Sequence, residues 1–384
     1  MEKVKLGDIA VLINGDRGKN YPSQADITEE GDVPFVNAGH LNGRSIDFGD
    51  MNYISKEKYE KLSSGKFEKG DILYCLRGSL GKKAIVNDDV VGAIASSLVI
   101  IRPDYERIDG DYLMFSLDSP SIKEQLVKAN NGSSQPNLSA ASVREYQIEL
   151  PDISLQKEVV EKLTRVRNVI DERQKELNLL DELIKARFVE MFSGESNMMK
   201  MSDICSIITD GTHQPPKFVT EGIPFIFVSN VVSNKLTYDA EKYITQETYD
   251  ELIKRTPIEI GDVLLSTVGS YGHPAVVESD RKFLFQRHIA YLKPKKEIVD
   301  SSYLHGALLS PGAQRQIEEG VKGIAQKTLN LSEIKKMVIP IPDLLKQNQF
   351  ADFVKQVDKS KVAVQKSLDE TQKLFDSLMQ EYFG

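Results

Sequence analysis

The chain of 384 residues contains no tryptophan and only two cysteines, Cys75 and Cys205. Two cysteines are too few for a disulfide framework or a structural zinc site. The opening sequence MEKVKLGD lacks the apolar h-region of a signal peptide, and the longest apolar runs are broken short of a membrane-spanning length. These absences predict a cytoplasmic protein that does not enter a membrane.

Motifs for catalysis are also missing. The segment RGSLGK resembles a phosphate loop, but its first glycine is absent, and Lys83 stands where Ser or Thr is required. No G-x-G-x-x-G follows a predicted strand, no H-E-x-x-H occurs, and the Asn/Asp-Pro-Pro-aromatic signature of amino-methyltransferases is not found. The five histidines are scattered without metal-ligand spacing. We therefore predict no catalytic residues, no metal and no cofactor.

Positive charge is not in excess either, because the formal net charge is −8. By itself this value argues mildly against a nucleic-acid partner. Overall charge does not report how Lys and Arg are distributed, so a basic surface on one part of the chain is compatible with it.

What the sequence does contain is an internal duplication. KGDILYCLRGSLGK at 69–82 returns as IGDVLLSTVGSYGH at 260–273, a shift of 191 positions. The same shift carries Pro151-Asp152 to Pro342-Asp343 and Gln156 to Gln347. VPF at 33–35 matches IPF at 223–225 with a shift of 190. The chain is therefore two copies of one unit of about 190 residues.

A long apolar stripe ends each copy. From Val159 to Met191 the apolar positions advance in alternating steps of four and three, with Arg173 and Arg187 in two of the slots. The equivalent stripe of the second copy is interrupted by Lys361 and Thr371. This heptad spacing predicts helices over 156–193 and 345–383, the first roughly 55 Å long. A stripe this narrow must be buried against another helix, and the copies are expected to pair antiparallel.

The globular part of each copy has mixed composition. Strands are predicted at 72–76, 84–86 and 98–101, and at 263–266, 274–277 and 289–292 in the second copy. Helices are predicted near 111–129 and 302–319, each followed by a short helix capped by Ser and a strand that ends at Pro. The expected fold class is α+β, with β-rich domains at 1–152 and 196–343 and long helices at 153–195 and 344–384.

The repeated G-S-x-G loops at 78–81 and 269–272 offer backbone amides for binding. Glycine lets the backbone approach a phosphate strand closely, although a tight hairpin without a ligand explains the same residues. Gln135 and Gln326 follow in matching positions. An amide side chain can bond an adenine edge with two hydrogen bonds, or it can cap a turn.

The chain has the order domain, long helix, domain, long helix. It contains the motifs GDIL…G-S-x-G and G-x-x-Q…N-L-S, and each long helix begins with P-D-x-x-x-Q. In these features it resembles the specificity (S) subunit of type I restriction-modification systems. The resemblance implies that each globular unit is a target recognition domain for one half of a split site in double-stranded DNA. It implies a helical spacer, two methyltransferase (M) subunits, two restriction (R) subunits and no catalysis by this chain. Apart from the shared frame, residues 11–31 and 196–222 differ, so the two half-sites should differ.

On this interpretation the basic and polar residues of the two domains are candidates for DNA contact, with solvated surface as the alternative for each. In the first domain they are Arg17, Lys19, Arg44, Arg77, Lys82 and Gln135; in the second they are His213, Lys217, His273, Arg287 and Gln326. Arg173, Arg187 and Lys361 either set the helix register or dock a partner. Two rival functions stay open, namely an enzyme with an unrecognised duplicated site and a structural coiled-coil adaptor with protein-binding end domains.

Overall fold

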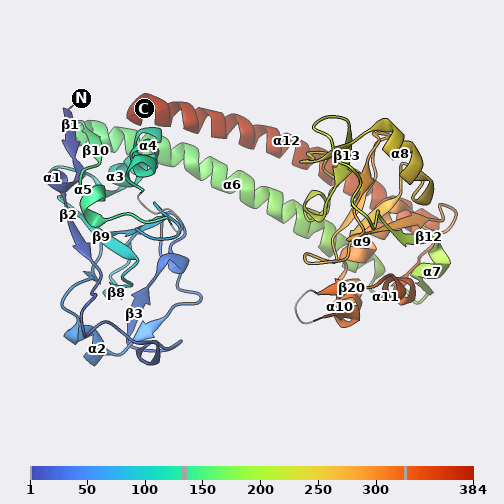
Figure 1. Ribbon diagram of the computed structural model, residues 1–384, viewed down its shortest axis with the longest axis horizontal. Helices are drawn as coiled ribbons and strands as arrows, with labels where there is room; N and C mark the ends of the chain where they lie inside the picture. The colour runs from blue at the N-terminus through green and yellow to red at the C-terminus, as the bar shows by residue number, and fades with distance from the viewer. Residues whose placement is uncertain (1, 131–135, 324–326) are drawn as a thin grey trace. The chain divides into compact units, whose positions relative to one another are not determined.

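The computed structural model describes residues 2–130, 136–323 and 327–384. The chain divides into two compact units (Figure 1), which we call unit 1, Met1–Glu172 with Ser367–Gly384, and unit 2, Arg173–Lys366. Each unit is a globular domain packed on parts of two 40-residue helices, α6 (Ile153–Phe192) and α12 (Leu344–Phe383). The predicted α+β class is confirmed.

The domain of unit 1 is built on short strands and short helices. In chain order they are β1 (Glu2–Lys5), α1 (Leu6–Ile9), β2 (Ala10–Asn14), a 3-10 turn (Gln24–Asp26), β3 (Val33–Val36), a second 3-10 turn (Ala38–His40), β4 (Tyr53–Ile54), α2 (Lys56–Lys61), β5 (Lys66–Phe67), β6 (Ile72–Cys75), β7 (Lys83–Ile85), β8 (Gly92–Ile94), β9 (Leu98–Pro103), α3 (Gly110–Ser116), α4 (Pro120–Ala129), α5 (Ala140–Arg144) and β10 (Gln147–Leu150).

Unit 2 repeats this order. Its elements are β11 (Met198–Lys200), α7 (Met201–Ile204), β12 (Cys205–Asp210), β13 (Ile223–Ile226), a 3-10 turn (Val228–Asn230), β14 (Tyr243–Ile244), α8 (Gln246–Leu252), a 3-10 turn (Ile253–Arg255), β15 (Val263–Ser266), β16 (Pro274–Val276), β17 (Leu284–Phe285), β18 (Ile289–Pro294), α9 (Ser301–Leu309), α10 (Pro311–Gly320), β19 (Val321–Lys322), β20 (Thr328–Leu329), α11 (Leu331–Lys336) and β21 (Val338–Pro340).

The main sheet has the same topology in both units, with strand order β2-β9-β6-β7 in unit 1 and β12-β18-β15-β16 in unit 2. Its neighbours pair antiparallel. A second sheet contains one parallel pair, β3 with β8 and β13 with β17. The continuous apolar sequence of the central strands follows from burial on both faces, because β6 and β15 have no exposed residue.

Two helix predictions required correction. The helices expected over 111–129 and 302–319 are each broken in two, because Ser119 and Ser310 cap new helices that begin at the following proline. A serine cap was also expected for the short helix near the end of each domain. Ser139 caps α5 in this way, accepting a hydrogen bond from the Ser142 amide, but in unit 2 the N-cap of α11 is Asn330.

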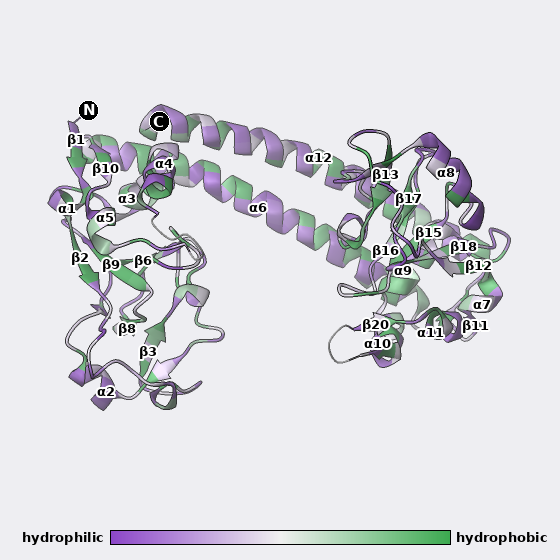
Figure 2. Cartoon of the chain, viewed as in Figure 1, coloured by the Kyte–Doolittle hydropathy of each residue, from purple (hydrophilic) through white to green (hydrophobic). Residues whose placement is uncertain are grey.

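The predicted apolar stripes are buried or half-buried along both long helices, and Figure 2 shows the alternation of apolar and polar residues along them. Within each unit, contacts at higher residue numbers on α6 are made with lower residue numbers on α12. In unit 1 the Lys162 ammonium lies 3.3 Å from the Tyr382 hydroxyl, whereas Arg167 stacks on Phe375. In unit 2 Asp181 pairs with Lys361, and Phe188 meets Phe350. The antiparallel pairing is therefore present in both units.

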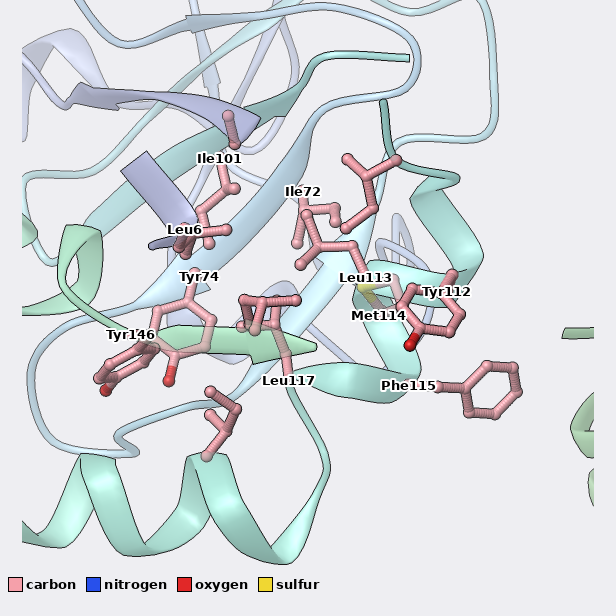
Figure 3. Packing of buried hydrophobic residues seen from close by; sticks show 14 of the residues in the cluster. Leu6, Ile72, Tyr74, Ile101, Tyr112, Leu113, Met114, Phe115, Leu117 and Tyr146 are labelled. Carbon is pink, nitrogen blue, oxygen red and sulfur yellow. The ribbon is translucent and has the colours of Figure 1, made fainter. Parts of the chain in front are cut away.

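The carboxyl-terminal turns of the long helices enter the domain cores. Phe375, Met379 and Phe383 of α12 are buried in the core of unit 1, and Phe188 and Phe192 of α6 are buried in the core of unit 2. In Figure 3 the Phe115 ring projects from α3 away from Tyr74 and Tyr146; its centroid lies 6.2 Å from that of Phe375. The heptad stripe missed Met379, Phe383, Phe188 and Phe192, since a helix that packs against both a helix and a domain needs a wider apolar face.

A buried glutamine joins each domain to its outgoing helix. Gln156 is fully buried; its side-chain oxygen accepts from the Asp109 amide at 2.8 Å, and its nitrogen donates to the carbonyls of Arg107 at 3.0 Å and Pro151 at 2.8 Å. Gln347 makes the same three bonds in unit 2, to Asp300, Ile298 and Pro342. The repeated P-D-x-x-x-Q motif is therefore the joint between sheet domain and helix.

Among the described residues, no helix is both long enough and apolar enough to cross a lipid bilayer. Cys75 and Cys205 are buried free thiols. Burial raises the pKa of the Cys205 thiol to about 12, so this group is an unreactive part of the core.

Gln156→Leu should destabilise unit 1 by about 3–5 kcal/mol, because it leaves one amide and two carbonyls without their partner. Urea unfolding of the variant and the wild type measures this difference. Asn168→Leu, at an exposed position of the same helix within unit 1, is the matched control and should change stability by less than about 0.5 kcal/mol. Equal effects of the two substitutions would show that the joint is unimportant.

Phe383→Ala should cost about 3–5 kcal/mol, since it opens a cavity where the ring is 4% exposed and packs 5.1 Å from the Tyr112 ring. Leu374→Ala is the control, because that side chain is 52% exposed on the same helix. Thermal unfolding compares the two variants. If Phe383→Ala melts like the control, the end of α12 does not belong to the core of unit 1.

Candidate nucleic-acid interface

One end of the main sheet gathers loops that are far apart in sequence. In unit 1 the Leu76 amide donates to the Ser97 carbonyl at 2.8 Å, and the Leu138 amide donates to the Leu76 carbonyl at 2.8 Å. The Gly78 amide donates to the Pro136 carbonyl at 3.2 Å. These bonds hold the loop after β6 between the turn before β9 and the segment before α5.

Unit 2 repeats each of these bonds with a shift of 191 residues. The Thr267 amide donates to His288 at 2.9 Å, the Leu329 amide to Thr267 at 2.8 Å, and the Gly269 amide to Lys327 at 3.2 Å. We call this surface the loop edge. It comprises residues 15–18, 76–82, 95–97 and 136–138 in unit 1, and residues 211–213, 267–273, 286–288 and 327–329 in unit 2.

Glycine brings the strand end after β2 or β12 against the same turn. A Cβ on Gly15 would lie 2.9 Å from the Ala95 carbonyl oxygen, and one on Gly211 would lie 2.3 Å from the Phe285 carbonyl oxygen. A side chain at either position would therefore force the backbone apart. The residue two places later, Arg17 in unit 1 and His213 in unit 2, consequently occupies an equivalent place.

In unit 1 the loop edge contains three of the predicted residues, and a fourth lies beside it. Arg17 is exposed, with a guanidinium nitrogen 3.4 Å from the Ser96 carbonyl. Arg77 is exposed and Lys82 half-buried on the loop after β6, and Lys19 is exposed in the turn that follows Arg17. The adjacent Lys83 is not available, because its buried ammonium pairs with Asp118.

In unit 2 the loop edge contains His213, His273 and Arg287. His213 and Arg287 are exposed, and the His273 Nδ1 lies 3.1 Å from the side-chain oxygen of Asn234. Burial lowers the pKa of His273, so that imidazole is neutral near pH 7 and acts as a hydrogen-bonding group instead of a cation. Lys217 is exposed on the loop between β12 and β13, outside the loop edge as defined.

Arg44 lies elsewhere. Its guanidinium bonds to the Asp111 carboxylate at 2.5 Å and stacks over Phe115 with its central carbon 4.9 Å from the ring centroid. Arg167 of α6 stacks on the same ring at 4.8 Å. These contacts tie the turn around Arg44 to α3 and α6. Gln135 and Gln326 lie outside the described residues, next to segments 136–138 and 327–329.

Sequence reasoning missed two polar groups of unit 2, Asp210 and Arg255. Asp210 ends β12, and its carboxylate accepts from Arg255 at 2.6 Å and lies 2.9 Å from the His213 Nε2. Arg255 lies 45 residues away in the 3-10 turn after α8. No spacing rule connects residues at that separation, so the sequence offered no signal for this cluster.

The aspartates of the repeated GD turns have a structural role. Asp71 is buried and receives two bonds of 2.8 Å from the Arg102 guanidinium, and Asp262 is buried and accepts from the Tyr291 hydroxyl at 2.7 Å. Each carboxylate also accepts a hydrogen bond from the backbone amide of the residue three positions earlier, Glu68 or Glu259. The turn is therefore fixed from within, and it lies at the opposite end of β6 or β15 from the loop edge.

The polar positions of the long helices are partly explained. Lys361 is 13% exposed and pairs with Asp181 on the facing helix. Arg173 and Arg187 pair with Glu176 and Glu190 of their own helix at 2.6 and 2.8 Å. Arg187 also contacts the facing helix, with its guanidinium carbon 5.7 Å from the centroid of the Phe353 ring, so the geometry of Lys361 and Arg187 is compatible with a role in helix register.

Within the described ranges, no group of three His, Cys, Asp or Glu side chains could hold a metal ion. What the loop edge offers is hydrogen-bonding groups, backbone amides and exposed cations, which suit a polar, anionic partner better than bond-making chemistry.

Known proteins share this organisation. Residues 1–182 and 194–371 each match the family model described as type I restriction modification DNA specificity domain. The chain is similar to the type I restriction enzyme MjaVIII specificity subunit of Methanocaldococcus jannaschii, at 21% identity over 98% of this chain and 91% of that protein. It also resembles the EcoBI specificity subunit of Escherichia coli, at 27% identity over 45% of this chain and 37% of that one.

Solved structures agree in fold. The S subunit of the M. genitalium type I restriction-modification system matches with a TM-score of 0.55 and 14% identity, over 100% of this chain and 96% of that one. A chain from a study of complex assembly and conformational transition of the type I R-M system matches at 0.58 with 19% identity, over 100% and 97%. Because the family model is matched twice and over most of the sequence, the chain belongs to the type I restriction-modification DNA specificity family.

Proposed function

We propose that the chain reads a split site in double-stranded DNA, each globular domain contacting one half-site through its loop edge. The observation that carries this proposal is that two equivalent loop edges, held by the same backbone bonds, present different side chains. Arg17 and Arg77 lie in the loop edge of unit 1, whereas His213 and Arg287 lie in that of unit 2, with Arg255 beside them in contact with His213. Because base edges are distinguished by donor and acceptor pattern, different side chains on one frame predict two different half-sites.

The domains we propose are 1–152 and 196–343 for recognition, with 153–195 and 344–384 as the helical spacer. A 40-residue helix is about 60 Å long, somewhat more than one turn of duplex. A stiff spacer of that length would leave base pairs between the half-sites uncontacted, and those would carry no direct sequence requirement.

The net charge of −8 is compatible with DNA binding if partner subunits supply further phosphate contacts. The partners we propose are two methyltransferase (M) subunits on the helical region and two restriction (R) subunits that join for cleavage, in the cytoplasm. Unit 2 has a suitable docking surface, where Leu179, Leu183 and Val189 of α6 are 68%, 48% and 44% exposed. They lie on the helix that lines a cleft of about 610 Å³ with Gly306 and Pro311.

Co-expression with the neighbouring M subunit, followed by mapping of methylated adenines, tests the proposal. The expected result is one motif with two specific parts and a gap of fixed length. Methylation without any motif would contradict it and would favour a structural adaptor.

Insertion of one heptad at the midpoint of both long helices should lengthen the gap by about 3 base pairs, because seven residues add about 10 Å of helix. The two half-sites themselves should not change. A heptad inserted into α6 alone is the control, since it misaligns the antiparallel stripes and should impair assembly. A double insertion that leaves the gap unchanged would contradict the spacer model.

Arg17→Ala should weaken DNA binding by the assembled complex roughly tenfold, because it removes an exposed cation from the loop edge of unit 1. Arg44→Ala should instead lower the melting temperature and leave the affinity of the folded complex nearly unchanged, because its contacts are internal. Titration of labelled duplex and thermal unfolding separate the two effects. If Arg44→Ala weakened DNA binding and Arg17→Ala did not, the DNA contact would lie at Arg44 and not at the loop edge.

A further inference from the structure

We infer that Arg255 reads a guanine in the half-site of the second domain, and that Asp210 is the residue that positions it. This inference rests on the proposed function and deepens it. Neither residue belongs to a repeated motif, and the two are brought together only by the fold.

The geometry fixes one part of the Arg255 guanidinium and exposes the remainder. Nη2 donates to the Asp210 Oδ1 at 2.6 Å, and the Asp210 side chain is only 18% exposed. The Arg255 side chain is 51% exposed and lies beside the loop edge, in contact with His213. A planar guanidinium held along one bond by a nearly covered carboxylate presents its other donors in a defined direction.

His213 lies against both members of the pair. Its Nε2 lies 3.2 Å from the Arg255 Nη2 and 2.9 Å from the Asp210 Oδ2. Arginine only donates and a carboxylate only accepts, so one imidazole nitrogen cannot satisfy both neighbours at the same time. His213, half-exposed and incompletely bonded, is therefore the member that can move aside when a base arrives. When His213 moves aside, the second Nη2 hydrogen of Arg255 is free next to a neighbouring N–H of the same guanidinium. Two adjacent N–H donors are the edge that arginine uses to bind guanine.

The partnership with Asp210 also decides between a base and a phosphate. The carboxylate neutralises Arg255 and would repel a phosphate placed against it, so the pair is a poor phosphate clamp. The guanine major-groove edge is uncharged and offers two acceptors, N7 and O6. Two adjacent N–H donors on a neutralised cation match that edge.

Unit 1 provides the comparison. The strand registers align Asp210 with Asn14, because Asn14 pairs with Val99 and Asp210 pairs with Ala290, 191 positions later. In unit 1 the loop after α2 is bonded instead by Asp16, whose buried carboxylate accepts from the Gly18 amide, the Ser63 amide and the Ser63 hydroxyl. The backbone bonds from Gly18 and Ser63 lower the pKa of Asp16. The carboxylate of unit 1 is therefore bonded by a neutral serine and backbone amides, whereas that of unit 2 is bonded by an exposed arginine. The Asp210–Arg255 pair is thus a feature of one domain, as a determinant of one half-site must be.

The test uses the complex with the co-expressed M subunit. After the wild-type motif is mapped, binding is titrated on duplexes that each change one base pair of the site. The wild type should discriminate against replacement of one guanine in one half-site by about 10- to 100-fold. Arg255→Lys, which keeps the charge but not the planar fork, should lose most of that discrimination, and Arg255→Ala all of it. Asp210→Asn should weaken discrimination at the same base pair.

Lys254→Ala is the matched control, since Lys254 is an exposed cation in the same 3-10 turn. It should leave the discrimination at every base pair unchanged, and all variants should retain the other half-site. The inference is overturned if Arg255→Lys keeps full discrimination, if affinity falls equally for all sequences, or if Arg255→Lys prevents assembly, which would assign a structural role. A wild-type complex without a two-part motif would overturn the proposed function, and this inference with it.

Discussion

The structure depends on a buried glutamine that occurs at the equivalent position in each copy. Gln156 and Gln347 each satisfy an amide and two carbonyls at the point where a sheet domain becomes a long helix. A buried amide with all three bonds made defines one geometry, because any rotation of the helix on the domain would leave polar groups unpaired in the interior. The equal lengths of the bonds in the two copies, 2.8, 3.0 and 2.8 Å, show that the same joint was kept when the copies diverged elsewhere.

The end of each long helix adds a second restraint. Phe383 of the second copy completes the core of unit 1, and Phe192 of the first copy completes the core of unit 2. Each domain is thus held by the start of its own helix and by the end of the other. Neither copy has a complete core alone, because each core includes side chains from the helix of the other copy.

Much of this organisation could be predicted from the sequence, because it is periodic or repeated. The heptad stripes predicted the long helices to within three residues at each end, and the duplication predicted two equivalent domains. The joint at Gln156 was visible as a repeated motif, although its bonds were not. Helix breaks at Ser119-Pro120 and Ser310-Pro311 were missed, although a serine followed by proline is itself a signal for the start of a new helix.

The site was less predictable than the fold. The glycine loops and Arg17 were found from residue type, and the structure brings them to one edge. Arg44 has the same residue type but is bonded to Asp111 and stacked on Phe115, which only tertiary structure reveals. Arg255 was missed because its partner, Asp210, is 45 residues away and neither lies in a repeated segment. A search for repeats finds residues that the two copies share, so it cannot find side chains that are present in only one copy.

The central claim is that each domain reads its own half-site independently on a common frame. Exchange of residues 1–152 for the corresponding domain of another specificity subunit, followed by mapping of methylated adenines, tests it most directly. The account predicts that one half-site changes to that of the donor protein while the other half-site and the gap stay the same. A change in both half-sites, or in neither, would contradict it.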